Sequence, residues 1–348
     1  MAAVSVLLDG RVEQGSFTLE VSLPFESGTV TGILGPNGSG KTTLLRAIAG
    51  LTPLTSGTLT VDDSDWTSLA PQDRSVGLVL ADPVLFPHLS ATDNVAFGPR
   101  SRGVATSTAR QRALEELDAL GIADLASRKP KALSTGQAQR VALARALATD
   151  PAVLLLDESL AGLDPQTRTS VRGVLASRLA HFDGTTIMVT HDAVDALTLA
   201  DELVFLEDGR LTQRGTPAQV SAAPRSTYAA TLVGLNLLPG NATGDGVVAT
   251  GLGEVRTTSD VTGGCWVSIR PNAVSLWRSP PEGSPRNAWQ MTVIGVEVLG
   301  QTARVMLSAG DARLVAEVTT LAVNELGLIA GAQVWASVKA TEIDCYPR

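Results

Sequence analysis

The sequence has few cysteines, no excess of basic residues and no long apolar run. Two cysteines among 348 residues, Cys265 and Cys345, exclude a disulfide framework and favour a reducing cytosol. No apolar run approaches the roughly 18 residues of a membrane-spanning helix, so another protein must hold the chain at a membrane if it works there. Residues 1–9 have no basic start and no long apolar core, and we expect no secretory signal there.

The charge balance is acidic, with 27 Lys and Arg residues against 35 Asp and Glu residues and a net charge of −8. A nucleic-acid-binding protein usually presents a basic face, so this balance argues against nucleic acid as a partner. Hydrophobic residues make up 44% and charged residues 18%, which is ordinary for a globular protein and excludes disorder as its main state. At about 150 residues per domain, the length predicts two domains.

Short apolar runs alternate with helical patterns over residues 1–210, which is typical of an α/β domain. Residues 29–34 predict a buried strand, followed by a Gly-rich loop and a helix over 41–49 that stops at Gly50. The remaining apolar patterns predict strands at 76–80, 153–156, 185–189 and 203–206, and helices over 108–120 and 138–148.

The character of the sequence changes around residues 214–240, where prolines and small residues predict a hinge. We place the domain boundary there, with a first domain over 1–235 and a second over 236–348. The second domain shows short strand-like runs divided by Gly, Pro and Asn, which predict a small β-barrel. These runs are residues 265–269, 291–298, 303–307, 314–318 and 334–338.

The most specific motif is a glycine-rich loop that fits the phosphate-loop pattern G-x-x-x-x-G-K-[ST] between a predicted strand and a predicted helix. Glycines let the backbone curl so that several N–H groups point at phosphate oxygens, and the helix N-terminus adds its positive end. Lys41 supplies a charge near the β- and γ-phosphates, and Thr42 offers a hydroxyl to Mg²⁺. The predicted nucleotide-binding residues here are Gly35, Pro36, Asn37, Gly38, Ser39, Gly40, Lys41, Thr42 and Thr43.

Two carboxylates end the apolar strand predicted at 153–156. An acid at that end of a strand lies at the mouth of the sheet, where ligands bind in α/β proteins. Asp157 is a candidate Mg²⁺ ligand, acting through water because Mg²⁺ gives up water reluctantly. Glu158 is a candidate general base that polarises the attacking water.

A third motif, residues 133–137, opens the helix predicted over 138–148. Ser134 and Gly136 at a helix start form an anion site that needs no cationic side chain, and Gln137 joins them. An ordinary serine N-cap is the alternative reading. Two further elements follow in order: Asp164 after Glu158, and His191 after the strand at 185–189. We assign no function to the other two histidines, His88 and His181.

These five motifs, in this order, resemble the ATPase subunit of an ABC transporter over about residues 1–235. The resemblance implies a P-loop NTPase fold of the ABC-cassette type, with the phosphate loop and Asp157 binding MgATP. It implies that residues 133–137 close over the γ-phosphate bound by a second copy, and that Asp164 lies in the loop crossing the dimer seam. It also implies that His191 is a switch residue that contacts the γ-phosphate, and that catalysis needs a homodimer.

The sequence departs from the family pattern at three places. Ala81 stands where the family usually has a Gln that reaches Mg²⁺ and the attacking water. Thr135 replaces the usual central Gly of the 133–137 signature. The aromatic residue that commonly stacks on adenine falls near Val12 by spacing, and Phe17 is a weaker substitute.

Residues 83–95 resemble the segment with which importer ATPases of the family grip an integral-membrane permease. Exposure of Leu85 and Phe86 would favour such an interface, and a Pro-interrupted piece of core is the alternative. The resemblance implies a peripheral protein on the cytoplasmic face of the inner membrane. An extracytoplasmic substrate-binding protein is then an indirect partner.

Residues 283–287 and 337–342 look like the OB-like, molybdate-binding domain of molybdate importer ATPases, with a barrel core at about 283–346. The resemblance implies oxyanion contacts from Ser284, Arg286, Thr319 and Lys339. Two cations with hydroxyl and N–H donors suit a tetrahedral dianion. The alternative is that these are surface residues of a structural appendage.

The combined reading is an ATP-hydrolysing importer subunit for an oxyanion, with molybdate or tungstate as the favoured cargo. Sulfate, ferric iron or a polyamine is the alternative cargo for the same kind of subunit. A soluble ABC ATPase is a different class, but it normally carries two cassettes or a long coiled coil, and this chain shows one cassette. A molybdate-storage or molybdate-sensing protein is a third class, for which the β-domain alone would suffice.

Overall fold

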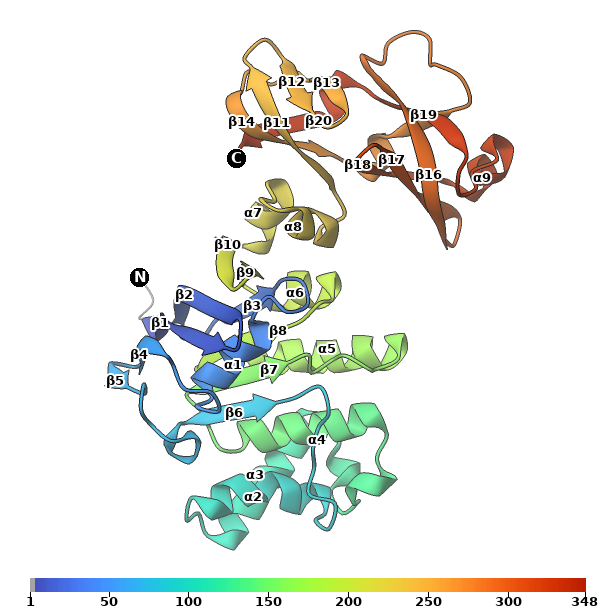
Figure 1. Cartoon of the computed structure of the whole chain (residues 1–348). Helices are drawn as coiled ribbons and strands as arrows, with labels where there is room; N and C mark the ends of the chain where they lie inside the picture. The colour runs from blue at the N-terminus through green and yellow to red at the C-terminus, as the bar shows by residue number, and fades with distance from the viewer. Residues whose placement is uncertain (1–3) are drawn as a thin grey trace. The chain divides into compact units, whose positions relative to one another are not determined.

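The structure, a computed structural model, describes residues 4–348, and its contacts divide the chain between Ala218 and Gln219 into two units (Figure 1). This division lies before the predicted domain boundary after residue 235. That boundary stays a prediction.

A six-stranded sheet forms the centre of the first unit, in the order β10-β9-β3-β8-β7-β6. Neighbours from β9 to β6 run parallel, and β10 is antiparallel to β9. All residues of β3 and β8 are buried, because both faces of a parallel sheet are covered. The strands are β3 (Val30–Leu34), β6 (Val76–Val79), β7 (Val153–Asp157), β8 (Thr185–Val189), β9 (Glu202–Glu207) and β10 (Arg210–Gly215).

A four-stranded antiparallel sheet, in the order β2-β1-β4-β5, shares a hydrophobic core with the parallel sheet. Buried and exposed residues alternate along β2, as in a strand with one face on the core. These strands were not predicted from the sequence. They are β1 (Val4–Gln14), β2 (Phe17–Glu26), β4 (Ser56–Val61) and β5 (Ser64–Asp65).

Helices surround the parallel sheet, and α2, α3 and α4 pack against one another (Figure 1). The helix predicted over 138–148 begins earlier, because Ser134 caps it. The helices of the first unit are α1 (Lys41–Ile48), α2 (Ala91–Ser101), α3 (Thr106–Ala119), α4 (Thr135–Leu147), α5 (Pro165–Leu179) and α6 (Ala193–Leu199), and α7 (Pro217–Ala222) follows at the division. Short 3-10 turns lie at Pro71–Asp73, Ala123–Leu125 and Pro130–Ala132.

The second unit contains α8 (Thr227–Leu232) and two five-stranded antiparallel sheets around one hydrophobic core. One sheet has the order β13-β12-β11-β14-β20, with β11 (Asn236–Thr243), β12 (Val247–Thr250), β13 (Gly253–Arg256), β14 (Thr262–Ile269) and β20 (Ile343–Pro347). The other has the order β15-β19-β16-β17-β18, with β15 (Ser275–Trp277), β16 (Asn287–Leu299), β17 (Thr302–Ala309), β18 (Ala312–Thr319) and β19 (Gln333–Val338). Helix α9 (Thr320–Leu326) follows β18, and 3-10 turns lie at Pro271–Ala273 and Ala340–Glu342.

The predicted fold class, an ABC-type α/β cassette with a small OB-like β-domain, is confirmed. The grouping of strands differs in one respect from the prediction of a single five-stranded barrel. The run at 265–269 lies in β14, in a different sheet from the four runs that follow it. Strands β11 to β13 were not predicted, because their short apolar runs are interrupted by glycine, proline and polar residues.

Candidate functional site

Three neighbouring parallel strands, β3, β8 and β7, end at the same edge of the central sheet. The phosphate loop follows β3, Glu158 follows β7 and His191 follows β8 shortly after its end. Ligands of α/β proteins bind at such carboxyl ends. The sheet order therefore brings together three motifs that are far apart in the sequence.

The glycines of the phosphate loop are required by its geometry. A Cβ atom at Gly35 would lie 2.0 Å from the carbonyl oxygen of Leu206, and Gly35 has a φ of 152°. Gly40 has a φ of 102° and forms the N-cap of α1 without a side-chain hydrogen bond. The first N–H groups of α1 are thus available at the loop, as an anion site requires.

Two side chains inside the loop fit a phosphate. The Nζ of Lys41 donates to the carbonyl oxygens of Gly35 and Pro36 at 2.8 and 2.9 Å. Burial lowers the pKa of Lys41, and the charges of Glu158 and Asp157 oppose that shift. Within the described residues, the buried Oγ of Ser39 has no hydrogen-bond partner, so it can bond a ligand oxygen.

The carboxylate of Asp157, at the end of β7, and the hydroxyl of Thr42, at the start of α1, are hydrogen-bonded neighbours. Burial raises the pKa of Asp157, and the neighbouring charge of Glu158 raises it further, whereas a hydrogen bond from the Thr42 side chain lowers it. A divalent cation would relieve this crowding of carboxylates, and hard oxygen donors are the ligands that Mg²⁺ prefers. The residues present therefore fit a magnesium ion beside the phosphate loop.

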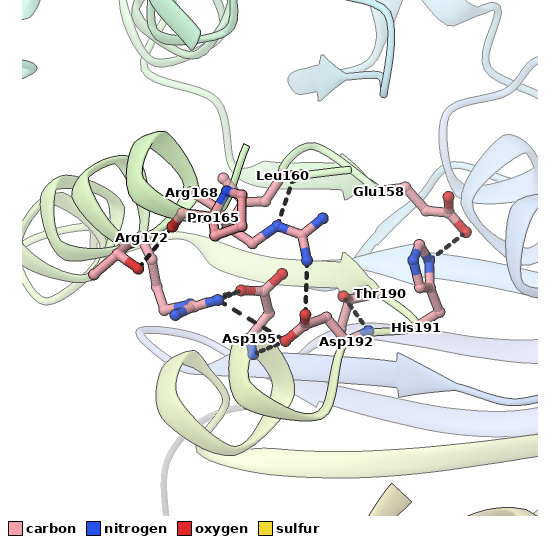
Figure 2. Close-up of polar contacts among 10 residues, drawn as sticks. Glu158, Leu160, Pro165, Arg168, Arg172, Thr190, His191, Asp192 and Asp195 are labelled. Carbon is pink, nitrogen blue, oxygen red and sulfur yellow. Dashed lines mark hydrogen bonds and ion pairs between the residues drawn. The ribbon is translucent and has the colours of Figure 1, made fainter. Parts of the chain in front are cut away.

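Glu158 and His191 approach each other across the ends of β7 and β8 (Figure 2). The Nδ1 of His191 lies 3.4 Å from Oε1 of Glu158, and the two side chains are 57% and 36% exposed. Glu158 has a φ of 49°, in the left-handed region, and its N–H donates to the carbonyl of Val189 at 3.0 Å. A strained residue held in this way is typical of functional sites.

A cleft of about 480 Å³ opens over the phosphate loop. Phe17, at the start of β2, lines it, and a Cβ atom at Gly40 would lie 2.9 Å from Cζ of the Phe17 ring. Val12, where spacing places the usual aromatic residue, is buried in the core. The cleft is lined by Gln14, Phe17, Asn37, Gly38, Gly40, Lys41, Thr42, Thr43 and Glu158.

The 133–137 signature starts α4 with a capping box. Ser134 Oγ accepts from the N–H of Gln137, and the side chain of Gln137 accepts from the N–H of Ser134 at 3.0 Å. The N-cap reading of Ser134 therefore holds within this chain, and its exposed hydroxyl still has a proton to donate. Asp164 is likewise the N-cap of α5 and accepts from the N–H of Thr167 at 3.0 Å.

The segment that resembles a permease contact is only partly exposed. Leu85 and Phe86 are half-buried, so the exposure that would have favoured an interface at these two residues is not found. Phe86 packs on Phe97 and lies under the Arg145 guanidinium. Within the segment Val84 is exposed at 60%, and Phe97, two residues beyond it in α2, is exposed at 46%.

The structure brings together two of the four predicted oxyanion contacts, Ser284 and Lys339. Both line a cleft of about 520 Å³ in the second unit, together with Arg270, which the sequence analysis missed. Glu282 and Glu342 also line it, so its charge is mixed. Thr319 instead caps α9, and Arg286 is exposed in the loop before β16.

The strand-end geometry and the phosphate loop define a P-loop nucleotide-binding ATPase. The ABC transporter family model matches residues 19–161, and the TOBE domain model matches residues 283–344. The chain belongs to the ATP-binding proteins of ABC transporters.

Similar proteins match almost the whole chain. The molybdenum import ATP-binding protein ModC of Mycobacterium tuberculosis is 41% identical over 94% of both chains. The molybdate/tungstate import ATP-binding protein WtpC of Pyrococcus horikoshii is 36% identical over 94% of this chain and 95% of its own. The Fe(3+) ions import ATP-binding protein FbpC of Agrobacterium fabrum is 38% identical over 81% of this chain and 82% of its own.

Among solved structures, the dimeric ATP-binding cassette MJ0796 bound to ADP and Pi is similar. It has 30% identity and a TM-score of 0.54, covering 61% of this chain and 98% of that one. The structure of cbiO1 from Clostridium perfringens gives a TM-score of 0.59 at 29% identity, covering 65% of this chain and 93% of that one. Among residues 4–348, no helix has the length and apolar character that a membrane span needs.

Proposed function

We propose that this chain is the ATP-hydrolysing subunit of an importer that takes up an oxyanion, with molybdate or tungstate as its cargo. The convergence of the phosphate loop, Glu158 and His191 at one sheet edge supports ATP hydrolysis. The cargo rests on relatives named as molybdenum and molybdate/tungstate import proteins, which match the chain through its second unit. The Fe(3+) import relative keeps ferric iron as the alternative cargo.

In the proposed mechanism, the N–H groups of the phosphate loop and Lys41 bind the nucleotide phosphates, and Phe17 packs against the base. Thr42 and Asp157 would hold Mg²⁺, which would neutralise negative charge on the nucleotide phosphates. Glu158 accepts a proton from the attacking water, and His191 contacts the γ-phosphate. Lys41 and Thr42 begin α1 after the phosphate loop, Asp157 ends β7, and Glu158 and His191 follow β7 and β8.

The active form is a homodimer in which Ser134, Gly136 and Gln137 of one copy close on the nucleotide of the other, with Asp164 at the seam. The similar cassette MJ0796 was solved as a dimer with ADP and Pi, which supports this arrangement. The exposed Val84 and Phe97 belong to the surface that contacts an integral-membrane permease. The protein then works peripherally at the cytoplasmic face of the inner membrane, and a substrate-binding protein delivers cargo from the other side.

The cleft in the second unit is the proposed oxyanion site, with Ser284, Lys339 and Arg270 as donors. Its two acidic residues oppose a free dianion, because like charges in one cleft disfavour binding. Arg286 and Thr319 do not line this cleft and are not among the proposed donors. Calorimetry on the full chain with molybdate, tungstate and sulfate tests the site, and no heat with any of them would leave the second unit without an anion role.

Two substitutions test the ATPase assignment. Glu158→Gln should keep ATP binding and lower kcat by about 10²–10⁴-fold, because it removes the general base. Lys41→Ala should instead weaken ATP binding, because it removes a phosphate-facing charge. Normal turnover of the Glu158→Gln variant would contradict the assignment of the base.

A further inference from the structure

The side chain of Arg168, on α5, bonds two loops of the candidate site at once (Figure 2). Its Nε donates to the carbonyl oxygen of Leu160 at 3.1 Å, and its Nη1 donates to Oδ2 of Asp192 at 2.7 Å. Leu160 lies two residues after Glu158, and Asp192 follows His191 directly. One guanidinium therefore joins the loop of Glu158 to the loop of His191.

The loop that carries Glu158 is bonded to α5 at two residues, Leu160 and Asp164. Asp164 caps α5, and Arg168, one turn further on, holds the carbonyl of Leu160. Leu160 itself is buried, and the N–H of Ala161 donates to the carbonyl of Glu158 at 2.8 Å. A shift of the Arg168 side chain would therefore also move the backbone of this loop, which includes Glu158.

Asp192 is equally constrained on the other side. Its N–H donates to Oγ1 of Thr190 at 3.1 Å, and its Oδ1 accepts from the N–H of Asp195 at 2.9 Å. Desolvation alone would raise the pKa of Asp192, but the Asp195 N–H and the charges of Arg168 and Arg172 outweigh it and lower that pKa. Asp192 is therefore a charged residue that is held in place itself and is bonded to Thr190, on the other side of His191.

A second ion pair supports the first from the same helix. The Nε of Arg172 donates to Oδ1 of Asp195 at 2.6 Å, and only 3% of the Asp195 side chain is exposed. The Nη2 of Arg172 also lies 3.8 Å from Oδ1 of Asp192. Helix α5 thus holds the start of α6 at two points, and Arg168 also reaches back to the loop of Glu158.

We propose that Arg168 is a positioning residue that sets the separation of Glu158 and His191 by fixing their two loops to one rigid group. The proposal rests on the proposed function of those two residues. An arginine suits this role because its planar fork donates in two directions, whereas a lysine is a single point charge. Arg168 acts on Glu158 and His191 through its hydrogen bonds to Leu160 and Asp192.

The expected signature is a loss of kcat without a loss of nucleotide binding. The phosphate loop lies between β3 and α1 and includes neither Leu160 nor Asp192, the two residues that Arg168 joins. The KM for ATP should therefore stay within about twofold. Misplacement of reacting groups by about 1 Å costs about 10²-fold in rate. Arg168→Gln in the full chain should therefore lower kcat by about 10–100-fold, and Arg168→Lys, which keeps the ion pair with Asp192, should lose less.

Arg178 provides a matched control on the same helix. Its Nη2 lies 2.8 Å from Oε1 of Glu116, and its side chain is 23% exposed, against 22% for Arg168. Arg178→Gln should reduce thermal stability about as much as Arg168→Gln but leave kcat within about twofold. Asp192→Asn keeps an N-cap on α6 and should lower kcat like Arg168→Gln, with the double variant no worse than either single one.

The experiment measures kcat, KM and Tm for these variants beside Glu158→Gln. Equal loss of kcat in the Arg168 and Arg178 variants, a raised KM at unchanged kcat, or additive losses in the double variant would each overturn the positioning role. Normal turnover in Glu158→Gln would instead overturn the proposed base, whatever the Arg168 variants do. The two failures are thus distinguishable.

Discussion

A Cβ atom on Gly136 would lie 2.3 Å from Cγ2 of Thr167, so the start of α4 is packed directly against the first turn of α5. Thr167 also donates its N–H to Asp164. This contact joins the 133–137 signature to the loop that carries Asp164. Packing inside one chain is therefore enough to require glycine at position 136.

Gly136→Ala should therefore destabilise the protein by about 1–3 kcal/mol, because overpacking forces one helix start to move. Urea unfolding of the two proteins measures the difference. Thr167→Ser removes the obstructing methyl group and should restore much of the loss in the double variant. If Gly136→Ala is as stable as the parent, the helices do not meet as described.

Phe17→Ala should weaken ATP binding about 5- to 160-fold, since stacking of a base on an aromatic ring contributes about 1–3 kcal/mol. Phe17→Trp keeps an aromatic face and serves as the control. Titration with a fluorescent ATP analogue measures both. Unchanged affinity after Phe17→Ala would show that the base lies elsewhere.

Ala81 is exposed directly after Leu80, whose carbonyl accepts from the Gln139 side chain at 3.0 Å. Ala81→Gln should raise ATP turnover by up to about tenfold, the effect of one new hydrogen bond to the attacking water. Ala81→Leu adds similar bulk without an amide and should not raise it. A slower or unchanged Gln variant would mean that another group already orients the water.

The two cysteines should react slowly in the folded protein. Cys265 is buried, and desolvation, together with a hydrogen bond that the Cys345 thiol shares with Cys265, raises the pKa of Cys345 to about 12. Because the thiolate is the reactive form, alkylation at pH 8 should be about 10²–10³-fold slower than for a free thiol of pKa about 8.5. Reaction with iodoacetamide before and after unfolding measures this. Rapid reaction of the native chain would contradict the stated environment of these thiols.

The phosphate loop and the carboxylates after β7 could be predicted from the sequence because each is local. A glycine-rich loop between a buried strand and a helix, or an acid after an apolar run, needs only a few neighbouring residues to be recognised. The order β3-β8-β7 was not predicted, because no local pattern says which parallel strands are neighbours. The predicted ATP-site roles of these residues stay predictions.

Other features were missed because their signal is spread over the chain. Arg168 and Arg172 stand one helical turn apart, as do Asp192 and Asp195, which is a pattern that any solvated helix face can show. Only the packing of α5 beside α6 turns the pattern into an ion-pair network. Sequence spacing favours Val12 over Phe17 as the residue near the base, yet the strand pairing places Phe17 at the start of β2, in the cleft.

The left-handed backbone at Glu158 lowers the stability of the folded protein at a residue that the proposed ATP hydrolysis requires. The left-handed conformation costs a residue with a Cβ atom about 1–2 kcal/mol of folding free energy, a cost that glycine does not have. Glu158→Gly should thus yield a protein that is inert as an ATPase and harder to unfold than the parent, whereas Glu158→Gln keeps the strain. Four aspartates, Asp62, Asp63, Asp150 and Asp208, share this left-handed backbone outside the candidate site. At Glu158 the same conformation fixes the direction of the carboxylate that the proposed mechanism uses, so selection for folding alone would favour glycine there.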